Sequence, residues 1–491
     1  MKIAVIGAGI GGLATAALLA KDGHDVEIIE KNEAPGGRAA VFEESGFRFD
    51  MGPSWYLMPD VFENFFAEFG VSAQEVLKLM RLDPSHRFFF EGDKAPIDIP
   101  DSLEGVADVI EGLEPGSRQR FLDYMVATGR QYHLITDHFL NRRYRGPLDL
   151  ISTKALAALR TLPLLGSVDT YVRRRFKTDK VRKLLEYSLV FLGTSPYQAP
   201  GMYSMMAHVD YAQGVYYPEK GIGSLVDAML ALGEERGVRL RLNAPVASLE
   251  CEAGVVKAVV LESGERLEYD LVISNADIHH TETVLLPAEA RSYSEEYWKS
   301  RTLAPSGLLI YLGIKGRVPQ LSHHNLYIAK DWDRHFDSIF KDPAWPENPS
   351  FYVCMPSATD PTVAPEGDEN LFVFLPLASK PELFQDKEAL ADILIKQIAE
   401  VCDIPDLSER VAYRRVFGPS DFVERYHSLG GSALGLAHTL SQTAFLRPSQ
   451  RSRRISNLYY VGAGVHPGIG MPVSVISAQI LRDSLRKEYR A

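Results

Sequence analysis

Cysteine is scarce in this chain, and its three cysteines, Cys251, Cys354 and Cys402, show none of the spacings of metal-binding motifs. Three widely separated cysteines cannot all pair, which favours a reducing, cytoplasmic compartment over a disulfide scaffold. We interpret each of them as a small buried hydrophobic residue. Internal repeats and low-complexity tracts are absent as well. The sequence therefore excludes a disulfide framework and indicates no metal site.

A net positive charge is also lacking. The 53 lysines and arginines are outnumbered by 64 aspartates and glutamates, which gives a formal net charge of −11. This balance argues against a nucleic-acid partner. A hydrophobic content of 46% and a charged content of 24% are ordinary for a soluble globular protein, and 491 residues suffice for two to four domains.

Long hydrophobic runs are rare, and the clearest one, residues 3–20, could be read as a signal peptide or a membrane anchor. It contains four glycines, however, and only Lys2 precedes it, so the basic segment of a signal peptide is missing. We interpret the run instead as the strand, turn and helix that open a nucleotide-binding fold.

Three glycines near the N-terminus, Gly7, Gly9 and Gly12, have the spacing G-x-G-x-x-G and lie between two apolar runs. In a dinucleotide-binding βαβ unit the first glycine permits a tight turn, the second lets the backbone approach a pyrophosphate, and the third lets helix and strand pack closely. Glu30 ends the second apolar run, where a carboxylate can bond ribose hydroxyls. The sequence therefore predicts a dinucleotide site.

A second glycine pair, Gly36-Gly37, follows directly and is joined to Arg38. Paired glycines allow backbone conformations closed to other residues, and a guanidinium can hold diphosphate or ribityl oxygens. A nicotinamide enzyme has no particular need of this extension, whereas FAD lies extended and requires a second clamp. An ordinary surface turn is the alternative interpretation, but the pattern favours FAD.

A glycine-rich segment near the C-terminus carries Gly462, Gly464 and His466 and leads into Met471 and Pro472. Proline is favoured in the first turn of a helix. We expect the glycines to pass close to the ribityl chain and pyrophosphate, and the helix N-terminus to face the flavin, where its dipole would stabilise negative charge. The alternative is a glycine-rich loop that closes a sheet.

The nucleotide-binding segments are thus scattered over the start, middle and end of the chain. We predict an α/β fold in which a Rossmann-like FAD-binding domain is interrupted by other domains. The expected parts are an FAD-binding domain of residues 1–80, 215–290 and 455–491, a substrate domain of residues 81–115 and 291–454, and a helical, partly basic subdomain of residues 116–214.

Positive charge is concentrated in the helical part. Residues 142–183 contain twelve lysines and arginines and three acids, a local charge of +9, so the remainder carries −20. Within them, residues 154–165 are apolar with sparse cations. A basic helix with an apolar face can lie on an anionic bilayer, each cation adding about 1 kcal/mol. The alternatives are a solvated helix face and a domain lid whose apolar side is packed in the core.

Taken together, these motifs resemble the FAD-dependent carotenoid desaturases of the bacterial phytoene desaturase type, a group within the amine-oxidase-like flavoproteins. The resemblance runs the whole chain and includes residues 49–53, 214–218, 221–223, 243–246 and 273–277. It implies noncovalent FAD, with the backbone of Val246 bonding the adenine. Trp55-Tyr56 and Met471 occupy positions where members of the family vary.

The resemblance implies an enzyme of carotenoid biosynthesis that dehydrogenates a polyene C–C bond by hydride transfer to flavin N5. Its substrate would be a phytoene-like carotenoid, and a quinone or oxygen would be the electron acceptor. Such substrates reside in the bilayer, which favours docking of residues 142–183 at the inner face of the cell membrane. Homo-oligomers are compatible with this picture.

Two side chains are candidates for acid–base chemistry. His466 could take a proton near the flavin, although a histidine in a cofactor loop is often structural. Asp149 could act deeper in the substrate channel, although an intrahelical ion pair is the simpler interpretation. Asp50 is interpreted as a turn-capping residue rather than as a base. His279 and His280 are not taken as a metal pair, because adjacent side chains point apart.

Several alternatives remain open on the same scaffold. They are a desaturase for a C30 or hydroxylated carotenoid, a redox-neutral carotenoid isomerase, and more distantly an amine oxidase. From another class, the chain could be a lipid-binding flavin-fold protein without redox function. Product analysis would separate the first two, and failure to bind FAD or to bleach with substrate would identify the last.

Overall fold

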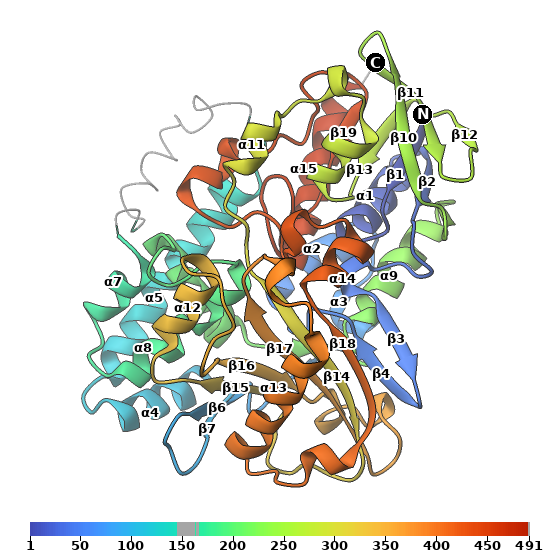
Figure 1. Ribbon diagram of the computed structural model, residues 1–491. Coiled ribbons are helices and arrows are strands. Elements are labelled where there is room, and N and C mark those ends of the chain that lie inside the picture. The colour runs from blue at the N-terminus through green and yellow to red at the C-terminus, as the bar shows by residue number, and fades with distance from the viewer. Residues whose placement is uncertain (145–162, 164–165, 490–491) are drawn as a thin grey trace.

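The computed structural model describes residues 1–144, 163 and 166–489 (Figure 1). Two large sheets organise this part of the chain, one close to both termini and one at the opposite end of the molecule (Figure 1). Asp149, interpreted as a possible catalytic acid or base, lies outside the described residues. So do residues 154–165, part of the expected membrane-docking region, with the exception of residue 163.

The first sheet is parallel, with five strands in the order β19-β13-β1-β2-β9. The sheet joins segments that are hundreds of residues apart, namely β1 (Lys2–Ile6), β2 (Asp25–Ile29), β9 (Arg239–Arg241), β13 (Leu271–Ser274) and β19 (Leu458–Tyr460). Its central strands read as continuous apolar runs because both faces are covered.

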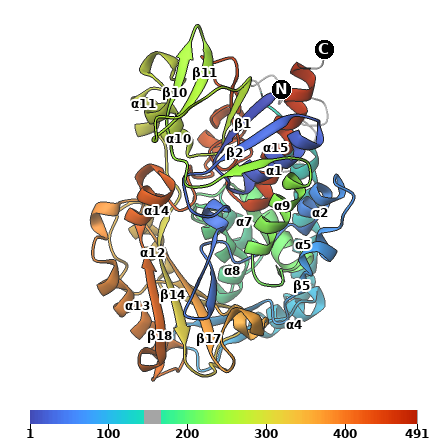
Figure 2. The ribbon, with the colours of Figure 1, turned by 90° about the vertical axis from the view of Figure 1, so that its right-hand side faces the viewer.

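The two faces of this sheet pack against different layers. Ile3 and Val5 pack into the core shared with α1 (Ile10–Lys21), whereas Ala4 and Ile6 pack into the core shared with a three-stranded antiparallel sheet. Helices α9 (Gly223–Glu234) and α15 (Met471–Glu488) pack on α1 (Figure 2). The antiparallel sheet consists of β10 (Val246–Glu252), β11 (Val255–Leu261) and β12 (Arg266–Leu267).

The second large sheet has seven strands in the order β18-β14-β17-β16-β15-β6-β7. Its pairings are antiparallel except for that of β15 with β6. In this order the strands are β18 (Val411–Phe417), β14 (Ser306–Ile314), β17 (Glu369–Leu377), β16 (Phe351–Cys354), β15 (His324–Ile328), β6 (His86–Phe90) and β7 (Ile97–Ile99).

Side-chain alternation gives this sheet two different faces. Leu308, Ile310 and neighbouring side chains pack with α13 (Lys387–Val401) on the outer face. Leu309, Tyr311 and their neighbours point inward to the main core. In Figure 2, α13 lies on one side of β14, β17 and β18, and α8 (Asp179–Glu186) lies on the other. The inner face is therefore the one available for lining a site.

Helices and short strands complete the described chain. They are β3 (Val41–Glu44), β4 (Phe47–Asp50), α2 (Pro59–Ala67), α3 (Ala73–Leu77), β5 (Met80–Arg81), α4 (Leu103–Leu113), α5 (Arg118–Ile135), α7 (Val168–Arg173), β8 (Tyr216–Tyr217), α10 (Ile278–His280), α11 (Glu295–Lys299), α12 (Trp332–Phe340) and α14 (Pro419–Tyr426). Among the described residues, none of the helices combines the length and the apolarity needed to cross a membrane.

The basic region is partly neutralised where it is described. Arg173 pairs with Asp169 at 2.6 Å, and Lys180 pairs with Asp93 at 2.6 Å. Lys183 is buried and donates to two backbone carbonyls, at 3.0 and 2.7 Å. Membrane docking through residues 142–183 stays a prediction, and so do the predicted domain boundaries.

Candidate cofactor and substrate cleft

A cavity of about 890 Å³ lies between the carboxyl ends of the parallel sheet and the inner face of the seven-stranded sheet. Ligands of open α/β sheets bind at the carboxyl ends of the strands. Its lining includes the loops after β1 and β2, the glycine-rich segment before α15, and apolar side chains of β14, β16 and β17. One end of the cavity is therefore built from backbone and the other from aromatic and aliphatic side chains.

The two N-terminal glycine motifs meet at this cavity. Gly7, Gly9, Gly36 and Gly37 all line it, and the N–H of Gly36 donates to the carbonyl of Ala8 at 2.8 Å. Gly36 has φ +107°, and a Cβ there would lie 2.8 Å from the backbone of Ala40. Only glycine fits this conformation and this contact. The motifs thus form one continuous backbone surface, as a pyrophosphate site requires.

Gly12 and Gly462 act through packing and are absent from the cavity lining. A Cβ on Gly12 would lie 2.1 Å from the carbonyl oxygen of Gly7, and one on Gly462 would lie 2.6 Å from Oδ1 of Asn275. The close approach expected for Gly462 is therefore made to Asn275, while Gly464 does line the cavity.

Glu30 lines the cavity at the end of β2 and is only 4% exposed. Its Oε2 accepts from the N–H of Ala8 at 2.7 Å, and its Oε1 accepts from the backbone and side-chain N–H groups of Asn32 at 2.9 and 2.8 Å. A carboxylate has about four acceptor positions, so one remains on Oε2 for a ribose hydroxyl. Val246, at the start of β10, lines the same end.

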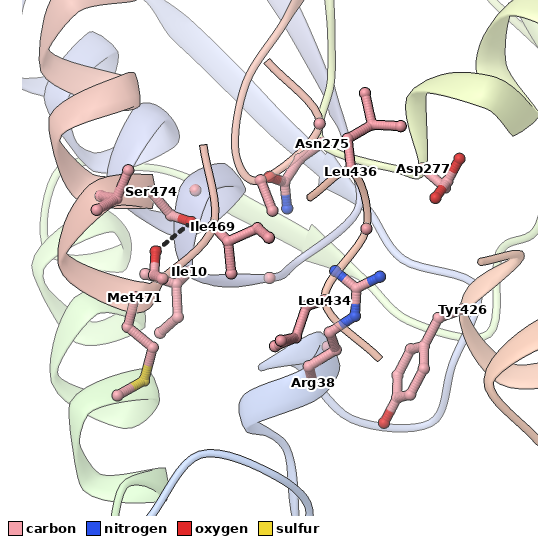
Figure 3. A pocket seen from close by; sticks show the side chains of 18 of the residues that line it. Ile10, Arg38, Asn275, Asp277, Tyr426, Leu434, Leu436, Ile469, Met471 and Ser474 are labelled. Atoms are coloured by element: carbon pink, nitrogen blue, oxygen red, sulfur yellow. Dashed lines mark hydrogen bonds between the residues drawn. The ribbon is translucent and has the colours of Figure 1, made fainter. Parts of the chain in front are cut away.

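Arg38 lines the cavity with an incompletely paired guanidinium. Its Nη2 donates to Oγ of Ser428 at 3.0 Å, while Nε is buried without a hydrogen-bond partner among the described residues. Burial lowers the pKa of Arg38, an effect opposed by the charge of Asp277. Figure 3 shows the guanidinium near Tyr426, with Asn275 and Asp277 across the site. A buried donor beside a cavity fits an oxygen-rich ligand such as a diphosphate.

The N-terminus of α15 closes the other side of the site. The helix begins at Met471, with Pro472 in its first turn, and both residues line the cavity. Ser474 bonds back to the carbonyl of Gly470 at 2.9 Å, so its hydroxyl stabilises the helix start (Figure 3). An 18-residue helix presents partial positive charge at this end, which suits an anionic or electron-rich ring.

His466 is half-buried and lines the cavity. Burial, reinforced by the charge of Arg447, lowers the pKa of His466 to about 4. The imidazole is therefore neutral at physiological pH and is a weak base. Its ring packs edge-on against Tyr144, with the centroids 5.0 Å apart.

The other polar residues singled out in the sequence have structural partners. Asp50 accepts from the N–H groups of Ile222 and Gly223 at 2.8 and 2.9 Å, so its carboxylate bonds the start of the distant helix α9. The rings of His279 and His280 have different neighbours. His279 lies against Trp298, and His280 stacks on His427 with the centroids 3.9 Å apart.

Sequence reasoning did not identify the apolar wall of the cavity. This wall includes Leu309, Tyr352, Phe372 and Phe374 from three strands of the seven-stranded sheet. The alternation of residues 369–377 could have indicated that Phe372 and Phe374 share a face. Nothing local, however, could have shown that this face meets the nucleotide-binding loops.

Comparison with known proteins identifies the fold and its cofactor. The model of the flavin-containing amine oxidoreductase family matches residues 10–480. The chain belongs to this family. The predicted Rossmann-like, amine-oxidase-like fold is thereby confirmed, and so is the flavin cofactor. The predicted cofactor, FAD, agrees with this family.

Relatives within the flavin-containing amine oxidoreductases are carotenoid desaturases. The carotenoid 3,4-desaturase of Haloarcula japonica is 43% identical over 489 residues, which cover 98% of this chain and 97% of the relative. The zeta-carotene-forming phytoene desaturase of Myxococcus xanthus is 34% identical over 487 residues, or 99% of this chain and 93% of the relative. The chain belongs to this group of sequences.

Solved structures show the same fold at low sequence identity. An oxidoreductase from Methanosarcina mazei superposes with a TM-score of 0.67 at 18% identity and covers 98% of this chain and 100% of its own. A redesigned putrescine oxidase gives 0.62 at 14% identity and covers 99% of both chains. At these identities the likeness concerns the fold alone.

Proposed function

We propose that this chain is an FAD-dependent carotenoid desaturase that removes two hydrogens across a C–C bond adjoining a conjugated polyene. The observation that carries this proposal is the cavity, in which backbone loops suited to FAD adjoin a wall of aromatic and aliphatic side chains. Full-length similarity to proteins named as carotenoid desaturases supports the same conclusion.

The roles of the chain's own residues follow from their positions. Noncovalently bound FAD supplies a hydride acceptor at N5. Gly9, Gly36-Gly37 and Arg38 would hold its diphosphate, and Glu30 and Val246 would hold its adenosine half. Leu309 and the aromatic side chains beside it align the polyene and exclude water. Burial of the polyene's apolar surface stabilises the bound state.

Dehydrogenation also requires the removal of a proton. His466 lines the cavity and is neutral, so it can accept a proton, but its pKa of about 4 makes it a weak base. Asp149 stays a second candidate, outside the described residues. Loss of activity in His466→Ala with unchanged FAD binding would support the first role.

The comparisons favour one member of the group over the others. Identity is 43% to a carotenoid 3,4-desaturase, against 34% to a phytoene desaturase and 32% to a 4,4'-diapophytoene desaturase. We therefore propose 3,4-desaturation of a carotenoid as the reaction, with phytoene desaturation as the second candidate.

Delivery of such a substrate requires contact with lipid. We propose peripheral attachment to the inner face of the cell membrane through residues 142–183, with a quinone or oxygen as the electron acceptor. A vesicle flotation assay at low and high salt tests the attachment, because electrostatic docking weakens as salt rises. Gel filtration tests the predicted homo-oligomer.

Anaerobic incubation of the FAD-loaded protein with liposomes tests the enzymatic proposal. One set of liposomes contains phytoene and the other contains lycopene, which is already conjugated. Chromatography with mass detection should show products that have lost two hydrogens, together with bleaching of the flavin. Product from lycopene alone supports 3,4-desaturation, and product from phytoene supports the second candidate. No product and no bleaching with either would refute the desaturase, whereas an isomer of unchanged mass would indicate an isomerase.

A further inference from the structure

Three potential metal ligands lie together on the inner side of the seven-stranded sheet, where β15 and β16 run side by side (Figure 1). They are His323, His324 and Cys354, and they are 3%, 0% and 1% exposed. His324 opens β15 and pairs directly with Cys354 of β16, while His323 immediately precedes the strand. One atom from each side chain lies within 4.8 Å of the other two.

Nδ1 of each imidazole has a hydrogen-bond partner. Nδ1 of His323 hydrogen-bonds Oγ1 of Thr359 at 2.7 Å, and Nδ1 of His324 hydrogen-bonds the hydroxyl of Tyr352 at 2.7 Å. Nε2 of each ring is buried and has no hydrogen-bond partner within the described part of the chain. The ring centroids are 4.5 Å apart.

Unsatisfied nitrogens at this depth require an explanation. Buried polar atoms in folded proteins nearly always have a partner, and leaving one without a partner costs about 1–3 kcal/mol. Metal-binding histidines commonly donate one ring N–H to an oxygen and ligate through the other nitrogen. The hydroxyls of Thr359 and Tyr352 occupy that orienting position for both rings.

We propose that Nε2 of His323, Nε2 of His324 and Sγ of Cys354 bind a transition-metal ion of the zinc class. Two imidazoles and a thiolate are ligands that such ions favour, whereas Mg²⁺ and Ca²⁺ require oxygen donors. Binding displaces the thiol proton of Cys354, which leaves one net positive charge for a divalent ion.

The surroundings provide compensation and a fourth ligand. A cavity of about 20 Å³ adjoins Cys354 and is also lined by Asp50, Ser54 and Tyr217. This volume can hold one water molecule beside Cys354, and a zinc ion with three protein ligands commonly takes a water as its fourth. The half-buried carboxylate of Asp50 and the buried carboxylate of Asp360 act electrostatically on Cys354 and His323 respectively, so negative charge lies close to the cluster.

The site lies directly behind the wall of the substrate cavity. Tyr352 lines the cavity and also holds His324, and Nε1 of Trp55 donates to the hydroxyl of Tyr352 at 3.0 Å. A metal that fixes His324 would therefore stabilise β15 against β16 and fix the position of Tyr352. Its role is structural, and it does not depend on the proposed function.

Sequence reasoning excluded metal because the cysteines have no motif spacing and neighbouring histidines were expected to point apart. The only histidine pair considered there was His279 and His280, and no role was assigned to His323 and His324. His323 precedes the regular strand, and its ring lies 4.5 Å from that of His324, centroid to centroid. Cys354 is then supplied by strand pairing, over a distance of thirty residues in the sequence.

Metal analysis of the full-length, FAD-loaded protein tests the proposal. The protein is stripped with a chelator, reconstituted with Zn²⁺ or Co²⁺ and desalted. We expect about one metal per chain, and a thiolate-to-metal charge-transfer band with Co²⁺. Cys354→Ala should bind less than about one-tenth of this amount and lose the band. Cys402→Ala is the matched control, since Cys402 is another buried cysteine, 3% exposed, at the end of α13 and outside the cluster.

A second measurement covers the case in which Cys354→Ala fails to fold. Chelation of the intact protein should lower its melting temperature, and Zn²⁺ should restore it, without release of FAD. Less than about one-tenth of a metal ion per reconstituted chain would overturn the proposal. Equal metal contents in Cys354→Ala and in the unsubstituted chain would do the same.

Discussion

Replacing Gly12 by alanine probes the contact on which the cofactor site depends. Gly12 lies in the first turn of α1, where an added Cβ would come 2.1 Å from the carbonyl oxygen of Gly7 and 3.1 Å from Nδ2 of Asn275. Ordinary van der Waals contact begins near 3.4 Å. Because the closer neighbour is a backbone atom, no rotamer change relieves the clash, and α1 must move by about 1 Å from the turn after β1.

The displacement has two measurable consequences. Overpacking of this kind costs about 1–3 kcal/mol of stability. It also displaces the loop that contains Gly7 and Gly9. That loop is held in place by the hydrogen bond from the N–H of Ala8 to Glu30, at 2.7 Å. If only about 1.4 kcal/mol of the strain acts on the bound state, the Kd for FAD rises tenfold.

Gly112→Ala is the matched control. Gly112 lies inside α4, and an added Cβ would have nothing within 4 Å. Alanine exceeds glycine in helix propensity by about 1 kcal/mol, so this substitution should stabilise the chain slightly and leave FAD affinity unchanged. Flavin fluorescence titration gives the Kd, and urea unfolding of the apo-protein gives the stability. A Gly12→Ala protein that binds FAD as tightly as Gly112→Ala would refute this account.

Three further substitutions test separate parts of the molecule. Arg38→Lys should weaken FAD binding about tenfold in the same titration, because lysine keeps the charge but loses the planar fork. Glu186→Gln should raise the free energy of unfolding at pH 9 and change it little at pH 4. Burial, with Asp169 nearby, raises the pKa of Glu186 from 4.5 to about 8, so its contribution to stability is lost as the pH rises through that range. The increase in the free energy of unfolding, measured by urea denaturation, is at most about 5 kcal/mol. Leu309→Phe narrows the apolar part of the cavity, so steady-state kinetics should show at least a tenfold lower kcat/KM for the carotenoid, about 1.4 kcal/mol, with an unchanged Kd for FAD.

Each of these has a result that contradicts it. Unchanged FAD affinity in Arg38→Lys would show that the guanidinium fork is not used. A pH-independent difference between Glu186→Gln and the unsubstituted chain would show that Glu186 titrates normally. Full activity of Leu309→Phe would place the polyene elsewhere in the cavity.

Much of the FAD half could be predicted from the sequence because local backbone requirements specify it. Gly7, Gly9 and Gly36 are needed where the chain turns sharply or approaches itself, and these constraints act over a few residues. The start of α15 at Met471 follows equally from glycine before and proline within the first turn. The exception is Gly462, whose close contact is with Asn275 and depends on the pairing of β13 with β19.

The substrate half could not be predicted in the same way. Leu309, Tyr352 and Phe374 become one surface only because β14, β17 and β16 pair in that order. Strand order is set by contacts between distant segments, and an apolar strand has the same local pattern whichever neighbour it takes.

The sequence by itself therefore determined the class of cofactor, since a dinucleotide is bound mostly by backbone whose conformations glycine and proline specify locally. Only the tertiary structure decided what lies opposite that cofactor. It joined an apolar wall to the FAD site and brought His323, His324 and Cys354 together behind it. Side chains from different strands can form one site only after long-range strand pairing has brought them together, and no local sequence pattern specifies that pairing.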